Sequence, residues 1–223
     1  MELEGIVPVN IVRDVKAPQA DSRVIVPFTQ AEIRAMLGAS VKGGGIYHGR
    51  EVKYKLANAA RNKAIILLML DTGLRASELC NAKISDCDLQ ASRIKVFGKG
   101  RKERIIEFSS ITGKSIWKYL AGRKDRGEDE WLFLTDDGRK MVRYALALLI
   151  RRIGERAGVK GAHPHRWRHT FAVMALMNGM DAFTLQTSLG HSSMDMVRRY
   201  LNVAQVDTGR IQKRASPVAN LGA

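Results

Sequence analysis

Residues 163–170 read His-Pro-His-Arg-Trp-Arg-His-Thr, and this stretch predicts the start of a helix that carries a basic cluster. Proline is favoured at the first helical position, because its missing N–H would have no partner there. His165, Arg168 and His169 are three and four residues apart, so they share one face of that helix. A helix N-terminus adds free backbone N–H groups and the positive end of the dipole, which favours a phosphate. Taken alone, the cluster fits a solvated basic face equally well.

A second stretch, residues 189–200, reads Leu-Gly-His-Ser-Ser-Met-Asp-Met-Val-Arg-Arg-Tyr. Ser192 and Asp195 have the spacing of a helix cap, which predicts that a new helix starts there and carries Tyr200. His191 then lies in the turn before this helix. In one continuous helix, residues nine apart would point to opposite sides, so the break allows His191 and Tyr200 to face one site. By itself, a tyrosine inside a helix is typical of a core or half-buried position.

Two other cations are ambiguous when each is considered alone. Arg75 opens a short predicted helix that also carries Glu78. An arginine there opposes the helix dipole and calls for a nearby anion, which could be Glu78 or a bound phosphate. Lys99 lies between two glycines at the tip of a predicted hairpin, where a solvated lysine is common.

The remaining patterns predict a mainly α fold with one small antiparallel sheet, an α+β class. Thr29 and Glu32 have capping-box spacing and predict a helix start. Residues 42–50, with three consecutive glycines, are expected to form a flexible loop. Other predicted elements are helices near 55–71 and 75–82, strands at 93–97 and 101–108, and helices around 117–120, 142–156 and 166–178.

Composition indicates the partner class. The chain has 37 Lys and Arg against 22 Asp and Glu, a net charge of +15, which favours a polyanion. Nucleic acid ranks first, because the basic residues are spread over several segments instead of lining one amphipathic helix suited to a membrane. No secretory signal or long apolar run is present, so a cytoplasmic, nucleoid-associated protein is expected. Cys80 and Cys87 lack metal-ligand spacing and are expected to be reduced thiols.

The order and spacing of these motifs resemble the tyrosine recombinase (phage integrase) family over residues 26–204. The matching features are Thr-Gly-Leu-Arg-x-Ser-Glu-Leu at 72–79, the hairpin lysine, His-x-x-Arg-His at 165–169, Leu-Gly-His at 189–191 and the tyrosine nine residues later. Trp167, where leucine is usual, and a long segment at 42–55 depart from the family pattern without touching a catalytic position. The resemblance implies that the catalytic residues are Arg75, Lys99, His165, Arg168, His191 and Tyr200.

The resemblance also implies a role for each of these residues. The two arginines would clamp the scissile phosphate with the two histidines beside it, Lys99 would protonate the leaving 5′-oxygen, and Tyr200 would attack phosphorus. A covalent 3′-phosphotyrosyl intermediate conserves the bond energy, so no cofactor and no metal are expected. The sequence agrees, having neither a P-loop nor a carboxylate cluster of the two-metal type. Arg101 and Lys102 are expected to contact DNA beside the hairpin tip.

Three segments follow from the resemblance. Residues 1–24 are expected to be an interdomain linker, with the N-terminal core-binding domain apparently absent. Residues 25–205 would form the catalytic domain, and residues 206–223 a tail that docks on a neighbouring protomer. The implied function is site-specific recombination of double-stranded DNA, with the full-length protein acting as a tetramer and without a membrane. The alternatives are DNA relaxation by a type IB topoisomerase and a non-catalytic DNA-binding accessory factor.

Overall fold

The computed structural model describes residues 26–47, 50–98, 103–123, 127, 130–190, 193–205, 216 and 218. Four predicted site residues lie outside the described residues: Lys99, Arg101, Lys102 and His191. The predicted linker 1–24 and nearly all of the predicted tail 206–223 also lie outside them. These predictions therefore stay predictions.

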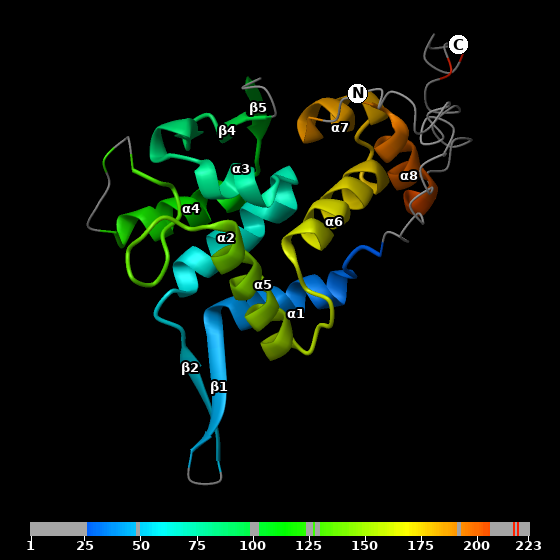
Figure 1. The fold of residues 1–223 in the computed structure, drawn as a ribbon. Coiled ribbons are helices and arrows are strands. Elements are labelled where there is room, and N and C mark those ends of the chain that lie inside the picture. Colours follow the sequence, from blue (N-terminus) through cyan, green and yellow to red (C-terminus); the bar gives the residue numbers. More distant parts are fainter. Residues whose placement is uncertain are drawn as a thin grey trace, which may run out of the picture.

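Helices form most of the described body, as expected (Figure 1). The central helix α2 (Ala59–Thr72) packs against three others, α1 (Gln30–Val41), α4 (Ser110–Ala121) and α6 (Pro164–Met177). Two more helices, α3 (Ala76–Asn81) and α5 (Arg143–Ala157), contact each other, and α5 also packs on α1. Burial of Met36, Met69 and Trp167 marks the main core, and Trp167 packs against the Phe28 ring at 4.8 Å between centroids.

The ends of several helices follow local sequence rules. The Thr29 capping box at the start of α1 is confirmed. Helix α2 ends at Gly73, whose φ of +61° is the left-handed conformation that favours glycine. A Cβ at Gly73 would lie 2.2 Å from a carbon of the Phe171 ring, so glycine also allows α6 to approach closely. This approach sets the basic face of α6 beside the start of α3.

The predicted lysine hairpin belongs to a small antiparallel sheet in the order β3–β4–β5, formed by β3 (Cys87–Asp88), β4 (Arg93–Phe97) and β5 (Glu103–Glu107). Alternate residues Ile94, Val96 and Ile106 are buried, which fixes the face that packs on the helices. Arg104 is the second residue of β5 and pairs with Val96 of β4.

The expectation of a flexible loop at 42–50 is wrong. Strands β1 (Lys42–Tyr47) and β2 (Arg50–Lys55) form a second hairpin that projects from the helical body (Figure 1). Glycines disfavour strands by themselves, but cross-strand pairing overrides that preference. Gly43 pairs with Tyr54, and a Cβ at Gly43 would lie 2.7 Å from the tyrosine ring, so the ring covers the bare glycine. Because β2 extends to Lys55, α2 begins at Ala59, four residues later than expected.

Helices α6, α7 (Ala182–Leu189) and α8 (Asp195–Ala204) enclose a second core (Figure 1). The sequence reasoning missed α7, although Asp181 caps its start and Gly190 its end. The predicted break before the helix that carries Tyr200 is confirmed, because α7 ends at Leu189 and α8 begins at Asp195. The N-cap of α8 is Met194, without a side-chain cap, and not Ser192 as the spacing indicated. None of the described helices is long and apolar enough to span a membrane.

Candidate active site

Glu78 is the anion that compensates Arg75. The Glu78 side chain is only 3% exposed and accepts hydrogen bonds from the Arg75 backbone N–H at 2.8 Å and from Arg75 Nη1 at 2.9 Å. Arg104 on β5 donates from both Nη atoms to the two Glu78 carboxylate oxygens, each at 2.9 Å. Burial works to raise the Glu78 pKa, but the bonds from Arg104 and Arg75 outweigh it and the pKa is lowered. Glu78 is therefore ionised at neutral pH and holds two guanidiniums.

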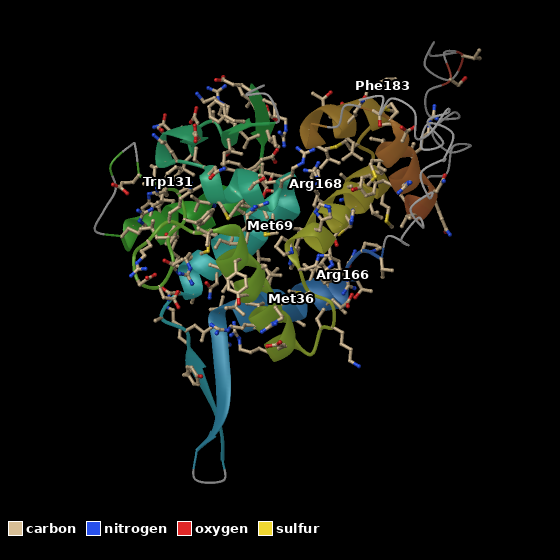
Figure 2. The ribbon with its side chains drawn as sticks, viewed as in Figure 1. Met36, Met69, Trp131, Arg166, Arg168 and Phe183 are labelled. Carbon is tan, nitrogen blue, oxygen red and sulfur yellow. The ribbon has the colours of Figure 1, made fainter. Side chains whose placement is uncertain are left out.

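Arg168 lies on the basic face of α6 (Figure 2) and links this helix to the ends of α2 and α7. Its side chain is buried, with Nη1 donating to the Gly73 carbonyl at 2.8 Å and Nη2 to the Leu189 carbonyl at 2.7 Å. Burial, aided by the nearby Arg75 charge, lowers the Arg168 pKa to about 10, so the side chain remains a cation at neutral pH. A buried arginine held by two backbone carbonyls keeps its guanidinium in a fixed orientation.

Three arginines bind consecutive carbonyls at the C-terminal end of α7. Arg104 Nε donates to the Ser188 carbonyl at 2.8 Å, Arg168 to that of Leu189, and Arg75 Nη2 to that of Gly190 at 3.1 Å. These carbonyls are the unpaired, negative end of a helix, which cations stabilise. The predicted clamp residues Arg75 and Arg168 are thus brought together at Leu189 and Gly190, the two residues that precede His191.

The predicted nucleophile lies at the same site. Tyr200 is 1% exposed, and its hydroxyl lies 2.8 Å from Nδ1 of His169. His165 and His169 meet edge to face, with ring centroids 5.2 Å apart. Burial raises the pKa of the Tyr200 hydroxyl, while the charges of Arg168 and Arg75 act to lower it. The structure therefore brings together four of the six predicted catalytic residues: Arg75, His165, Arg168 and Tyr200.

Both imidazoles at the site are neutral at pH 7. Burial and the charges of Arg168 and Arg75 lower the pKa of His165. Burial, with His165, His163 and Arg168 nearby, lowers the pKa of His169 from 6.5 to about 4. A neutral His169 ring can accept the Tyr200 hydroxyl proton at Nδ1.

This lowered pKa predicts a pH-dependent stability. Between about pH 6.5 and 4 the unfolded chain binds a proton at His169 that the folded chain does not, so the free energy of unfolding falls as the pH falls through that window. Each such proton contributes a slope of about 1.4 kcal/mol per pH unit. We expect His169→Gln to reduce the loss of melting temperature between pH 7 and pH 4.5. Because His163 and His165 also have lowered pKa values, some dependence will remain. Unchanged pH dependence in the variant would contradict this account.

Sequence reasoning missed Arg104 and described His169 and Glu78 only in part. The contacts of Arg104 had no local signal, because its partners are 26 and 84 residues away in the sequence. The contact between His169 and Tyr200 also depends on packing of α6 against α8. Glu78 was recognised as one possible anion through its i,i+3 spacing from Arg75. Among the described residues, no group of three His, Cys, Asp or Glu side chains could hold a metal ion.

Comparison with known proteins identifies the family. The model of the phage integrase family matches residues 45–206. The chain belongs to the phage integrase family. Tyrosine recombinase XerC of Staphylococcus epidermidis is 36% identical over 177 residues, which cover 77% of this chain and 59% of that relative. This phage integrase family chain thus spans about three-fifths of the length of that curated relative.

Solved structures share the fold. The crystal structure of XerA recombinase has a TM-score of 0.69 and 29% identity, and the match covers 91% of this chain and 68% of that one. XerH site-specific recombinase, described as a post-cleavage complex bound to palindromic difH substrate, has a TM-score of 0.66 and 22% identity, with 91% of this chain and 56% of that chain covered. These matches confirm the mainly helical phage integrase catalytic-domain fold.

Proposed function

We propose that this protein cleaves and rejoins double-stranded DNA at specific sites through a covalent 3′-phosphotyrosyl intermediate on Tyr200. The observation that carries the proposal is the convergence of Arg75 and Arg168 on one helix end, within the electrostatic reach of the Tyr200 hydroxyl. Among the described residues, Arg75, Arg104 and Arg168 are grouped around the single carboxylate of Glu78, so this cluster has a surplus of positive charge. Membership of the phage integrase family supports phosphoryl transfer as its use.

The two clamp arginines have different degrees of exposure that suit phosphate binding. Arg75 is 36% exposed and can reach a ligand, whereas Arg168 is buried and rigid. Together the two guanidiniums would hold the non-bridging oxygens of the scissile phosphate, where negative charge grows in the transition state.

The proposed reaction forms one bond and breaks one. The Tyr200 oxygen bonds to phosphorus as its proton passes to a neighbouring neutral imidazole, and the bond from phosphorus to the 5′-oxygen breaks. His165 and His169 are both neutral at pH 7 and can accept that proton. Lys99 would protonate the leaving oxygen, with His191 beside the phosphate. Attack by a 5′-hydroxyl on the phosphotyrosine then rejoins the strand, with no need for ATP.

Several wider features of this proposal come from family resemblance. The partner would be double-stranded DNA in the cytoplasm, with Arg101 and Lys102 contacting the duplex, and a tetramer would assemble on DNA in the full-length protein. The segment 206–223 would dock on a neighbouring protomer. The net charge of +15 supports a polyanionic partner and predicts binding that weakens steeply with salt.

The test is covalent capture. The protein is incubated with a library of duplexes that carry a randomised central region and a nick that lets the released fragment, which ends in the new 5′-hydroxyl, diffuse away. We expect a DNA-linked species on a denaturing gel, and sequencing of the linked DNA will identify the preferred site. DNA binding without any covalent species would instead support a non-catalytic accessory factor. Exchange of strands between two captured sites, as opposed to simple relaxation of a supercoiled plasmid, separates a recombinase from a topoisomerase.

A further inference from the structure

Arg104 uses its whole guanidinium inside the protein. Its side chain is 11% exposed. Its Nε donates to the Ser188 carbonyl at 2.8 Å, and Nη1 and Nη2 donate to the two carboxylate oxygens of Glu78 at 2.9 Å each. This paired geometry leaves little of Arg104 for a ligand and directs it toward other residues of the site.

The end of α7 is shaped around the Arg104 side chain. Gly190 ends α7 with a φ of +62°, and a Cβ there would lie 3.0 Å from Arg104 Nη1 and 3.2 Å from Cζ. The glycine backbone therefore lies directly against the guanidinium. The Gly190 carbonyl in turn accepts from Arg75, which is itself held by Glu78. Arg104, Glu78, Arg75 and the α7 end thus form a closed ring of contacts.

We propose that Arg104 is a positioning residue that fixes both Arg75 and the C-terminal end of α7 for the reaction. This inference rests on the proposed function for its catalytic part. Through Glu78, Arg104 sets the orientation of the Arg75 guanidinium. Through the Ser188 carbonyl, it holds the turn that leads into His191.

A lysine at this position could not make the same set of contacts. Arginine presents a planar fork that binds both oxygens of a carboxylate while its Nε reaches a third acceptor. A lysine ammonium is a point charge at the end of a flexible stem, so Arg104→Lys would keep the charge and lose the geometry. Arg104→Lys therefore separates the positioning role from a general electrostatic one.

Arg93 provides a matched control. It lies on the adjacent strand β4, is 51% exposed, and pairs with Asp88 at 3.2 Å, outside the ring of contacts. In the DNA-free protein, hydrogen exchange measured by mass spectrometry should be faster over residues 182–190 in Arg104→Lys than in Arg93→Lys. Equal exchange in the two variants would overturn the proposed hold on α7. This measurement does not depend on activity.

The proposed effect of Arg104 on the reaction is tested with the duplex identified by covalent capture. The same duplex carrying a methylphosphonate at the scissile position is the second substrate. The methyl group replaces one charged oxygen, so a guanidinium clamp contributes less to the reaction. We expect Arg104→Lys to slow adduct formation about 100-fold on the phosphodiester, the effect typical of a lost oxyanion donor. On the methylphosphonate the defect should shrink to less than about 10-fold, while Arg93→Lys behaves as the unmodified protein on both. A defect equal on both substrates would show that Arg104 does not act through the phosphate clamp.

A second variant covers the case in which Arg104→Lys does not fold. Glu78→Gln keeps the side-chain shape and the Arg104 bond to Ser188, but it weakens the hold on Arg75. It should show the same methylphosphonate-sensitive defect with little change in exchange over α7, and an insensitive defect would overturn the proposal. If the unmodified protein forms no adduct, the proposed function is wrong, and the exchange comparison still decides whether Arg104 holds α7.

Discussion

Replacing Tyr200 by phenylalanine will abolish the covalent protein–DNA adduct while duplex binding stays within about twofold of the unmodified protein. The substitution removes only the hydroxyl oxygen that would attack phosphorus. The ring remains to fill its buried position. Loss of the hydrogen bond to His169 should cost about 1 kcal/mol of stability, which leaves the domain folded.

Tyr144→Phe is the matched control for Tyr200→Phe. Tyr144 lies on α5 and is 79% exposed, so loss of its hydroxyl should not change adduct formation. Denaturing gels report the adduct, gel shifts report duplex binding, and thermal melting reports folding. A covalent adduct formed by Tyr200→Phe would show that the nucleophile is another residue.

Arg168→Lys is expected to slow adduct formation by about 10²- to 10³-fold, or about 3–4 kcal/mol in the transition state, as for a lost oxyanion donor. Arg168 holds the Gly73 and Leu189 carbonyls with separate Nη atoms, and lysine cannot reach both while also facing a phosphate. Lysine retains the positive charge, so a large loss in the rate of adduct formation would come from the changed hydrogen-bond geometry. One buried carbonyl would lose its partner, and stability should fall by about 1–3 kcal/mol.

Arg151→Lys is the control for the arginine-to-lysine change. Arg151 on α5 is 66% exposed and forms an i,i+4 pair with Glu155 at 3.3 Å, so its replacement should alter neither rate nor melting temperature. Rates are measured in single turnover with the captured duplex at a temperature where both variants are folded. A rate for Arg168→Lys within about threefold of the unmodified protein would contradict the clamp geometry.

Local rules predicted much of the fold correctly. The Thr29 capping box, the proline that starts α6 and the strand 93–97 are all features of neighbouring residues, so short sequence windows contain them. The hairpin at 42–55 was not predicted, because its glycines disfavour a strand by themselves. Pairing with the partner strand and contact with the Tyr54 ring stabilise the strand. Helix α7 was missed although its capping residues are local.

The sequence likewise predicted some features of the candidate site and not others. Motif order indicated the family and the candidate residues Arg75, His165, Arg168 and Tyr200, whereas local periodicity indicated the mainly helical class. The position of Arg75 at a helix start left Glu78 and a bound phosphate open as its anion, and the structure shows Glu78 bonded to Arg75.

Only the tertiary structure decided how these groups are held. Arg104 meets Glu78 and the end of α7 across 26 and 84 residues, and His169 meets Tyr200 across 31. Such contacts depend on how α6, α7, α8 and the sheet pack around buried side chains, and no sequence window contains that information. Periodicity and capping arise from interactions between near neighbours, so the chain specifies them locally. The orientation of a guanidinium or a phenol is set by distant partners that only the packed core brings within reach.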